Sequence, residues 1–493
     1  MHLQRIQVPD FRVLKDVDIT FEKEFVPSIF PLGSLNGGGK STLLQLIFVL
    51  LHCSVNPDRK MFLQNMLNNF KSYKTSDHRV LAIFNILNKG KNVQIQFFSH
   101  KDSHINEVLI KKGITEIIDD KNITFSSRVK LEENQNRIKF ITKKITELEK
   151  TINQLDIIKK NESDEERSLR FRREITKLRE MGVTLPRIIS SRNLSAIEEY
   201  QKAIQEEWEV SKIQLKKLDK KHRELELASQ EVLEYLESEN LIYICNYSVN
   251  PNESEDEVLL CHINNLDRVE AESFLKELSE KVFLAAPSTQ IFLFLSEKAR
   301  KLLFRKQSEE ENGYYSNLKE AKSKLSGLFT YDFIDVDLLI ESFKAARDRD
   351  FRKAIETGGE YGNSYKELIK YLNLILVNKK INPNIELSGV NFQLDRDDEN
   401  IELQPEDLSH GELKRLSIYL WLKYRNIENA IVLMDEIEIA FHPDWQYQII
   451  SDLQDWAPSN QYILATHSYE LCQALTPSHV KELEPKLLKK QET

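Results

Sequence analysis

A glycine-rich loop in front of Lys40 constrains the fold of this chain more than any other stretch. The segment LGSLNGGGKSTLL, residues 32–44, places four glycines before a Lys-Ser-Thr triplet. Glycines let successive backbone N–H groups turn inward and let a triphosphate approach without meeting a Cβ atom. The phosphate-loop pattern G-x-x-x-x-G-K-[S/T] requires a glycine at position 34, where the chain has Ser34, so the strict pattern fails by one residue.

The flanking segments supply the context that a phosphate loop needs. Residues 28–32, SIFPL, predict a short buried strand, and residues 41–51, STLLQLIFVLL, predict a helix. In such a strand–loop–helix unit, Lys40 would reach the β and γ phosphates and the Ser41 hydroxyl would bind Mg²⁺ at the positive end of the helix dipole. The alternative is a glycine-rich turn that only caps a helix, and such a turn does not require Lys-Ser-Thr.

Composition limits the class of protein. The 493 residues, 41% hydrophobic and 30% charged, suffice for two or three structural units. With 69 basic and 78 acidic residues, the net charge of -9 argues against a uniformly cationic nucleic-acid coat. The longest apolar run, residues 43–55, is shorter than the ~20 residues that span a bilayer. The four cysteines form no C-x-x-C pair and no secretory signal opens the chain, so we expect a reduced cytoplasmic protein with no membrane partner.

Hydrophobic spacing divides the chain into three parts. Residues 1–115 predict strands around one helix, which form the N-terminal part of a nucleotide-binding head. Residues 385–493 predict the C-terminal part of the same head. Residues 116–384 form an insertion, with long helices at about 127–240 and a mixed α/β segment after them. The predicted fold class is α/β with a helical insertion.

Within the insertion, apolar residues recur at gaps of three and four, which is the a/d seam of a coiled coil. Gly182 and Pro186 lie between two such seams and can reverse the chain. We therefore expect an antiparallel hairpin of ~45 residues per arm, about 70 Å long. An ordinary helical bundle is the alternative. The seams are formed by Leu131, Ile138, Ile141, Ile145, Leu148, Ile152 and Leu155, and by Ile204, Trp208, Leu215, Leu218, Leu225, Val232 and Leu236.

The C-terminal hundred residues supply a second half of the site. The segment NAIVLMDEIEIAFHPDWQ, residues 429–446, is an apolar strand that ends at Asp435 and Glu436, as in a Walker B element. Asp435 would lie near the Mg²⁺, and Glu436 can polarise a water against the γ-phosphate. A later strand, QYILATHS, ends at His467, which can contact the γ-phosphate. Taken alone, the two acids could be solvated and His467 could be a structural cap.

A second phosphate cradle is predicted upstream. The segment DLSHGELKRLSIYLWL, residues 407–422, predicts a helix whose first turn holds Ser409, Gly411 and Glu412. A serine hydroxyl and an approachable glycine backbone at a helix N-terminus suit a phosphate group.

Together these four elements resemble the ATP-binding-cassette ATPases, and specifically their soluble SMC/RecF/Rad50-like branch. The resemblance covers residues 1–115 and 385–475, and the order of the motifs is highly specific. It implies an ABC-type P-loop ATPase head in which LSHGE takes the place of the LSGGQ-type signature motif. In that family the signature completes the site of the opposite subunit, so two ATP molecules lie within a head-to-tail homodimer or a larger oligomer.

The resemblance also assigns roles. Glu436 becomes the catalytic base and His467 the switch, while Ser41 and Asp435 support Mg²⁺. Ile437 replaces the usual proline after Asp-Glu, and no glutamine is assigned to the Q-loop, so we expect slow hydrolysis. The implied ATP-binding residues are Asn36, Gly37, Gly38, Gly39, Lys40, Ser41, Thr42 and, from an early FR element, Arg12; the implied signature residues are Ser409, Gly411 and Glu412.

The segment DEIEIAFHPDWQ is similar to an element of a bacterial subgroup that includes the overcoming-lysogenisation-defect (OLD) proteins. In many of these a Toprim nuclease follows the head, whereas only 26 residues follow His467, too few for a nuclease domain. The resemblance then points to the ATPase subunits of two anti-phage systems, Septu and PARIS, with Septu preferred. We expect a regulatory ATPase that senses phage or DNA and gates a separate nuclease of the HNH or Toprim type.

Other functions fit the same motifs. A Rad50/RecF-like DNA repair ATPase would need a basic surface, which the arginines of residues 167–179 could supply, although glutamates interleave them. A membrane-transporter ATPase fits less well because of the coiled-coil insertion and the unassigned Q-loop. A nuclease within this chain would need a metal-binding cluster that the scattered acids of the insertion do not supply.

Overall fold

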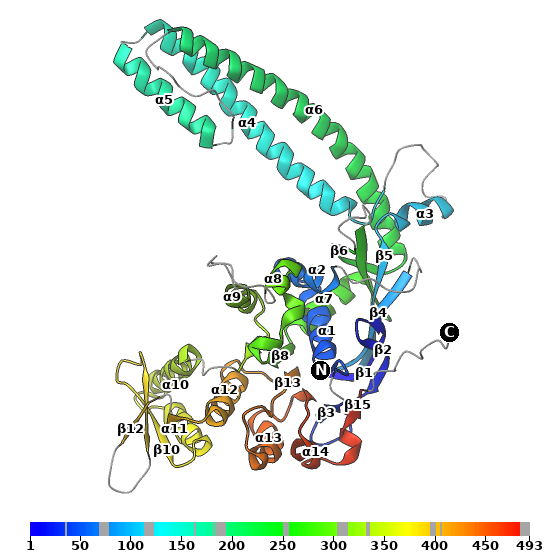
Figure 1. The fold of residues 1–493 in the computed structure, drawn as a ribbon, viewed down its shortest axis with the longest axis vertical. Helices are drawn as coiled ribbons and strands as arrows, with labels where there is room; N and C mark the ends of the chain where they lie inside the picture. Colours follow the sequence, from blue (N-terminus) through cyan, green and yellow to red (C-terminus); the bar gives the residue numbers. More distant parts are fainter. Residues whose placement is uncertain are drawn as a thin grey trace. The chain divides into compact units, whose positions relative to one another are not determined.

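The computed structural model divides the chain into two compact units (Figure 1). One unit combines Met1–Lys101 with Asn240–Thr493, and the other is Asp102–Glu239. The structure describes residues 1–34, 37–68, 78–112, 123–161, 164–180, 183, 194–249, 256–302, 314–331, 336–394, 401–404 and 407–483.

An antiparallel sheet forms one layer of the first unit, with the strand order β2-β1-β4-β5-β7-β6. Alternation of buried and less buried residues along β1 shows that one face packs on a core. Four of these strands lie within residues 1–115, where the sequence analysis predicted strands around one helix. The strands are β1 (His2–Phe11), β2 (Leu14–Thr20), β4 (His78–Asn88), β5 (Lys91–Lys101), β6 (Leu241–Ser248) and β7 (Asp256–Ile263).

A parallel sheet forms the second layer, with the order β15-β3-β14-β13-β8-β9. Its central strands β13 and β14 are buried at every residue and apolar except for Asp435 and Gln461, as parallel strands covered on both faces usually are. Leu433 and Ile463 face one core, and Val432 and Leu464 face the other. The strands are β3 (Ile29–Gly33), β8 (Val282–Ala286), β9 (Leu328–Thr330), β13 (Ile431–Asp435), β14 (Gln461–Ala465) and β15 (Lys481–Glu482).

Helix α1 (Lys40–Cys53) lies in the core that both sheets share. Every residue from Leu43 to Cys53 is buried, and the same hydrophobic cluster contains Phe84 of β4 and Leu433 of β13. A helix that is apolar on all sides is stable only when it is buried on all sides. The two sheets therefore enclose α1 and hold its N-terminus at the edge where β3 ends.

Helices lie on the other side of the parallel sheet, and a small antiparallel sheet of order β10-β11-β12 packs against one of them. Its strands are β10 (Lys379–Pro383), β11 (Val390–Leu394) and β12 (Glu402–Leu403). The covering helices are α10 (Val336–Thr357), α11 (Ser364–Ile375), α12 (His410–Tyr424) and α13 (Pro443–Trp456). The remaining helices of this unit are α2 (Lys60–Leu67), α7 (Arg268–Ser279), α8 (Glu297–Leu302), α9 (Tyr314–Lys324) and α14 (Tyr469–Gln473), with 3₁₀ turns at Pro57–Arg59, Ser288–Gln290, Phe292–Phe294 and Pro477–His479.

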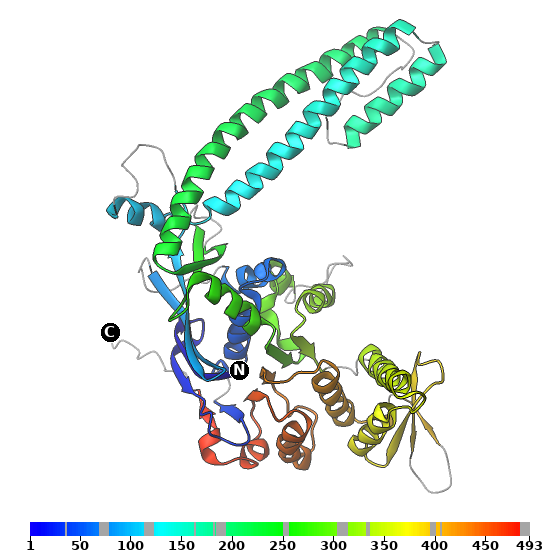
Figure 2. The same ribbon diagram turned by 180° about the vertical axis from the view of Figure 1, so that it is seen from behind.

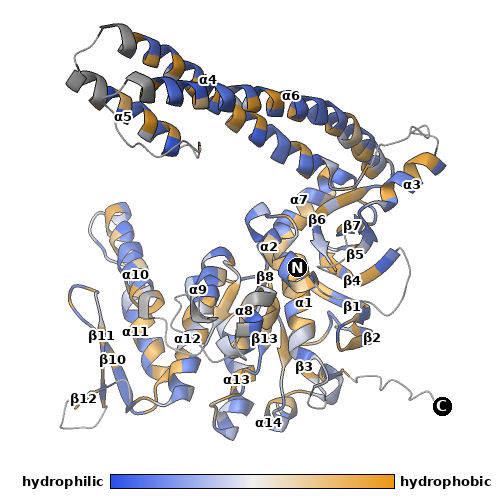
Figure 3. Cartoon of the chain, turned by 45° about the horizontal axis from the view of Figure 1, so that its top comes forward, coloured by the Kyte–Doolittle hydropathy of each residue, from blue (hydrophilic) through white to orange (hydrophobic). Residues whose placement is uncertain are grey.

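The second unit is built from long helices, α4 (Ser127–Asn161), α5 (Asp164–Glu180) and α6 (Leu194–Ser238), with a short α3 (His104–Lys111). Helices α4 and α6 run antiparallel, because Asn134 Nδ2 donates to Leu218 O at 3.0 Å while Trp208 Nε1 donates to Glu149 Oε1 at 3.0 Å. Helix α5 lies beside them in both ribbon views (Figures 1 and 2). Blue and orange residues alternate along all three helices in Figure 3, as helices that pack on one face require.

The α/β class with a P-loop head and a helical insertion is confirmed. The units differ from the predicted parts, which divided the chain at residues 115 and 385. The helical unit is shorter, Asp102–Glu239, because strands β6 to β9 pair into the two sheets of the first unit. The first arm is also divided: α4 ends at Asn161 and α5 packs back through Phe171, whose ring lies 5.3 Å from that of Tyr200. Most of the predicted reversal, residues 181–189, lies outside the described residues.

No helix in the described ranges combines the length and the apolar character that crossing a bilayer requires.

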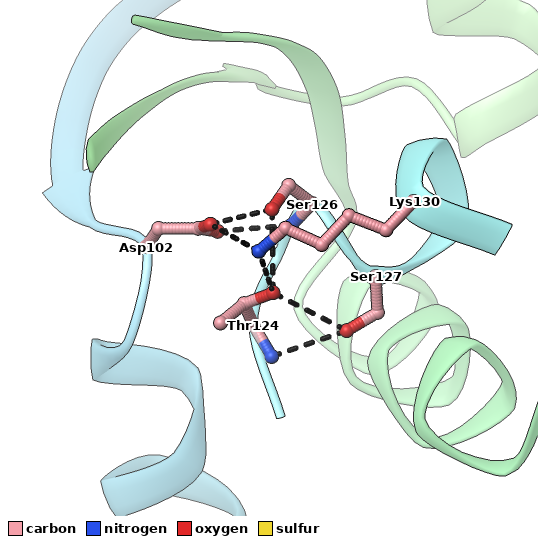
Figure 4. Close-up of polar contacts among 5 residues, drawn as sticks. All are labelled: Asp102, Thr124, Ser126, Ser127 and Lys130. Atoms are coloured by element: carbon pink, nitrogen blue, oxygen red, sulfur yellow. Dashed lines mark hydrogen bonds and ion pairs between the residues drawn. The ribbon is translucent and has the colours of Figure 1, made fainter. Parts of the chain in front are cut away.

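A buried carboxylate organises the start of α4 (Figure 4). Asp102 accepts hydrogen bonds from the Ser126 N–H at 2.9 Å and the Ser126 hydroxyl at 2.5 Å, and Lys130 Nζ lies 3.4 Å away. Ser127 Oγ accepts from the Thr124 N–H at 3.1 Å. The backbone groups that precede the helix are therefore satisfied by side chains, as buried helix ends require.

Replacing Asp102 with Ala should loosen the start of α4. The substitution leaves the buried Ser126 N–H without an acceptor and leaves the Ser126 hydroxyl with Thr124 Oγ1, 3.2 Å away, as its remaining partner, at a cost of about 1–3 kcal/mol. Hydrogen exchange followed by mass spectrometry should show faster exchange of the amides in residues 124–130, with α1 unchanged. The exposed Glu133→Ala on the same helix is the control. Unchanged protection in Asp102→Ala would show that the carboxylate does not hold this segment.

Candidate active site

The phosphate loop places its glycines where the backbone needs them. Gly37 and Gly39 have φ of +80° and +87°, in the left-handed region that other residues avoid. Gly39 is the N-cap of α1, and a Cβ atom there would lie 2.8 Å from Val13 Cγ2 and from Leu14 Cδ2. The turn between β1 and β2 therefore packs directly on the loop. Asn36, a predicted ATP-binding residue, lies outside the described residues.

Lys40 is buried, and its ammonium group lies between Ser34 of the same loop and His467 after β14. Its Nζ donates to His467 Nε2 at 2.9 Å and to the Oγ and O of Ser34 at 3.1 and 3.3 Å. Burial lowers the pKa of Lys40, against the pull of the carboxylates at 435, 438 and 436. Ser34, the residue that breaks the strict loop pattern, is thus itself a partner of the ammonium group. In this structure Lys40 joins the loop to the segment after β14.

Ser41 and Asp435 meet at the base of the loop. The Ser41 hydroxyl donates to Asp435 Oδ1 at 2.9 Å. The other oxygen, Asp435 Oδ2, is buried with no hydrogen-bond partner in the described part of the chain. Burial raises the pKa of Asp435 to about 7, and the nearby Glu436 and Glu438 act in the same direction, opposed by Ser41 and Lys40.

These two oxygens fit a divalent cation that also binds phosphate. Mg²⁺ prefers carboxylate, hydroxyl and phosphate oxygens and keeps several waters. The described residues contain no cluster of three or more His, Cys, Asp or Glu suited to a metal. A cation between Ser41 and Asp435 would therefore take its remaining ligands from a nucleotide and from water.

Glu436 follows Asp435 in a strained conformation. Its φ is +49°, and its N–H donates to Ala465 O at 2.9 Å. Non-glycine residues at positive φ are uncommon and persist only when the surrounding structure holds them. The bend turns the Glu436 side chain from the strand direction toward Gln290, which donates to its carboxylate.

Gln290 is a site residue that the sequence analysis missed. It ends the turn Ser288–Gln290 after β8, and its Oε1 accepts from Ser41 Oγ at 3.4 Å. Gln45 Nε2 fixes the Gln290 backbone by donating to its carbonyl at 2.8 Å. Gln290 thus connects the residue expected to bind the metal with the expected base, Glu436. The local sequence PSTQ carries no motif that would have singled it out.

Two further missed residues hold the backbone at this bend. Lys414 Nζ donates to Glu436 O at 3.0 Å and to Ile439 O at 3.1 Å. The same ammonium lies 4.1 Å from the ring centre of Tyr331, whose hydroxyl donates to the carbonyl of Asp435. Because both residues bind carbonyls, they support the positive φ of Glu436 without using its carboxylate.

Glu438 is a third carboxylate of the site. Its Oε1 accepts from the His467 N–H at 2.7 Å, and its Oε2 is buried with no partner among the described residues. Glu438, the last acid of DEIE, was visible in the sequence, but its partner His467 lies 29 residues away in the chain. Glu438 positions the backbone of His467 and adds negative charge beside Lys40.

The predicted signature residues form a separate cluster. Ser409 is the N-cap of α12 and forms a capping box with Glu412. Lys379 Nζ donates to both oxygens of Glu412 at 2.9 and 2.7 Å; burial opposes ionisation, but the hydrogen bonds from Lys379 and Ser409 outweigh it and lower the pKa of Glu412. A Cβ atom on Gly411 would lie 2.8 Å from Ala440 O. Glu412 therefore has a structural role in this chain.

The structure thus brings Lys40, Ser41, Asp435, Glu436 and His467 together, and Gly37 to Thr42 lead into the first turn of α1.

Arg12 has a different contact. Its guanidinium donates to Met66 O at 2.8 Å at the end of α2, and burial, with Arg300 nearby, lowers the pKa of Arg12 to about 10. An approach of Arg12 to the nucleotide stays a prediction.

Comparison with known proteins finds a matching family model and curated relatives. The family model described as AAA ATPase domain matches residues 1–472. A curated relative, the Retron Ec83 probable ATPase of Escherichia coli, is 32% identical over 108 residues, 20% of each chain. Another, the Retron Vc95 probable ATPase of Vibrio cholerae serotype O1 biovar El Tor, is 40% identical over 52 residues, 10% of each chain. The matched segments thus span a fifth or less of the relatives' own length.

Solved structures also align with the chain. The Smc head domain with an extended coiled coil bound to the C-terminal domain of ScpA, from Pyrococcus furiosus, aligns over 96% of this chain and 92% of its own, with a TM-score of 0.29 and 9% identity. The Smc head domain with a coiled coil and joint from Pyrococcus yayanosii aligns over 96% and 93%, with a TM-score of 0.30 and 13% identity.

Removing Gln290 should slow hydrolysis more than it weakens nucleotide binding. In Gln290→Ala the Glu436 carboxylate loses its donor and its fixed position, so kcat should fall about tenfold to a hundredfold. Binding of a fluorescent ATP analogue should change only a few-fold. Gln393→Ala in the small sheet is the matched control. An unchanged kcat would exclude Gln290 from the reaction.

The raised pKa of Asp435 predicts a pH-dependent cost to stability. The folded protein keeps this proton up to about pH 7, whereas the unfolded chain loses it near 3.8, so the stability of wild type falls as pH rises between these values. Asp435→Asn removes the cost, which grows by about 2 kcal/mol between pH 5.5 and 7. In thermal unfolding without nucleotide or Mg²⁺, the melting temperature of the variant should rise relative to that of wild type over this range. The difference should persist above pH 7. The exposed Asp444→Asn should show no such gain, and a constant difference for Asp435→Asn would contradict the prediction.

Proposed function

Because the chain belongs to the AAA ATPase domain family and is an ATPase, we propose that it is the regulatory ATPase of a bacterial anti-phage defence complex. In this proposal its nucleotide state gates a separate effector nuclease. The observation that carries the ATPase part is the meeting of Lys40, Ser41 and Asp435 with Glu436 and His467, which come from three distant segments. Such a convergence of phosphate-binding, metal-binding and basic groups suits phosphoryl transfer to water.

Each group has a role in this reaction. The N–H groups of residues 37–42 and Lys40 bind the phosphates, and Lys40 exchanges its contacts with Ser34 and His467 for phosphate oxygens. Glu436, oriented by Gln290, accepts a proton from the attacking water. His467, whose backbone is fixed by Glu438, hydrogen-bonds the γ-phosphate. Mg²⁺, when bound by Ser41 and Asp435, would neutralise charge on the phosphates.

The working form in this proposal is a head-to-tail homodimer with two ATP molecules, or a larger assembly of such dimers. Ser409 and Gly411 begin α12, where the helix dipole attracts an anion. In a dimer they would bind the γ-phosphate held by Lys40 of the other copy. Helix α12 also carries Lys414, which holds the backbone of Glu436. Binding of the other copy at the start of α12 would therefore be transmitted through this helix to the backbone of Glu436.

The defence role rests on two lines of support. The segment DEIEIAFHPDWQ resembles an element of the bacterial subgroup that includes the OLD proteins, and in the sequence analysis this architecture is related to the ATPase subunits of Septu and PARIS, each of which is paired with a separate nuclease. The named relatives are retron ATPases, although the aligned segments are short. The proposed partners are therefore a nuclease chain of the HNH or Toprim type and DNA.

Native mass spectrometry of the protein co-expressed with its genomic neighbours tests the proposal. With ATP and Mg²⁺ we expect a complex with a nuclease chain that Glu436→Gln stabilises, because the variant binds ATP but hydrolyses it at least about a hundredfold more slowly. Lys40→Ala should lose the nucleotide-dependent assembly. Lys370→Ala and Glu356→Gln, both on exposed helix positions, are the matched controls.

An ATP-dependent dimer that binds duplex ends and no nuclease chain would overturn the gating proposal in favour of a Rad50/RecF-like repair ATPase. A monomer in which Glu436→Gln hydrolyses ATP at the wild-type rate would overturn the assignment of the site itself.

A further inference from the structure

We propose that a groove on the helical unit is the docking site for an acidic amphipathic helix of a partner protein. The groove has a volume of about 600 Å³ and lies between α4 and α6. Phe140 in its wall is 55% exposed, although a phenylalanine gains most from burial. The lining residues are Asn136, Arg137, Phe140, Ile141, Gln214, Lys217 and Leu218.

The groove continues the face on which α5 already packs. Leu148 and Leu155 of α4 belong to the hydrophobic cluster that includes α5, and Ile141 lies seven and fourteen residues before them. Ile204 of α6 belongs to the same cluster, and Leu218 lies fourteen residues after it. Residues seven apart share one side of a helix in a coiled coil. The described lining of the groove comes from α4 and α6 alone. Helix α5 therefore covers this face near Leu148, Leu155 and Ile204 but does not line the groove near Ile141 and Leu218.

Helix α5 shows what such a face binds. It contributes Phe171, Ile175 and Leu178, an i, i+4, i+7 set of apolar anchors. This is the spacing by which an amphipathic helix lies in a hydrophobic groove. A partner helix with the same spacing would place its anchors over Phe140, Ile141 and Leu218.

The charge around the groove specifies the polar side of that helix. Residues 137–144 contain four Lys or Arg and residues 212–223 contain six, with a single acid, Asp219. Three of the lysines form ion pairs with glutamates outside these ranges: Lys144 with Glu207, Lys212 with Glu149 and Lys220 with Glu224. Arg137 and Lys217 stand directly on the rim. Acidic residues beside the apolar stripe of a partner would meet them, which favours encounter and fixes orientation.

Two other occupants fit less well. A second copy of this chain would bring the same basic rim, Arg137 and Lys217, to a symmetric contact, where like charges repel. A nucleic acid would use the basic rim, but its sugar-phosphate backbone gains little from a wall formed by Phe140, Ile141 and Leu218.

Fluorescence anisotropy with the full-length protein tests the proposal. The probe is a labelled synthetic peptide with Phe, Ile and Leu at the α5 spacing on a glutamate-rich helix, and a scrambled peptide of the same composition is the reference. We expect Arg137→Glu/Lys217→Glu and Phe140→Ser each to weaken binding about tenfold or more. Lys139→Glu/Lys216→Glu, the same charge change on exposed positions of the same two helices outside the groove lining, should bind like wild type. Basal ATPase activity, unchanged in every variant, confirms folding.

Other results overturn the proposal. Equal binding of the scrambled peptide, or equal loss in Lys139→Glu/Lys216→Glu, would show unspecific attraction to a basic surface. Displacement of the probe by a 20-base-pair duplex or a single strand at lower concentration would assign the surface to nucleic acid. A dimer in the absence of nucleotide that Phe140→Ser dissociates would assign the groove to a second copy. Failure of the gating proposal leaves this test unaffected, since peptide binding is measured without nucleotide or nuclease.

Discussion

The parallel pairing of β3 with β14 is the interaction on which the candidate active site depends. It sets Leu32 opposite Ala465, so the loop that follows β3 and the segment that follows β14 leave the sheet side by side. Strand β13, on the other side of β14, places Asp435 opposite Ala465 as well. The carboxyl ends of parallel strands are where α/β proteins gather their reactive groups. Lys40, Asp435 and His467 meet because three strand ends meet, and α1 is held between the two sheets at that edge.

Much of this arrangement could be predicted from the sequence because the information is local. Three local patterns each predict one part of the site. They are the glycines before Lys-Ser-Thr, the apolar strand that ends in two acids and the strand that ends in histidine. Gln290, Lys414 and Tyr331 were missed for the opposite reason. Each acts on the site through contacts with residues more than twenty positions away, and a glutamine after PST or a lysine inside a helix has no pattern of its own.

The fold shows the same division. Periodicity predicted the long helices, but it could not show that α5 folds back, since a seam of apolar residues is equally compatible with one partner or two. Nor could it show that β6 to β9 complete the two sheets of the first unit, because strand pairing is settled by tertiary packing. Local sequence patterns also could not show that carboxylates of the site are buried without full hydrogen bonding. Asp435 and Glu438 each keep one buried oxygen without a partner in the described chain, so the protein bears a cost that a bound cation and phosphates would relieve.

The burial of α1 has a consequence for biosynthesis. This helix is apolar on all sides, and part of its cover, strands β13 and β14, is encoded almost four hundred residues later. At ribosomal rates that interval lasts about 20 to 80 s. During this interval the apolar surface of α1 is not yet covered by β13 and β14. A chaperone that binds this surface would take the place of the two strands until they are synthesised.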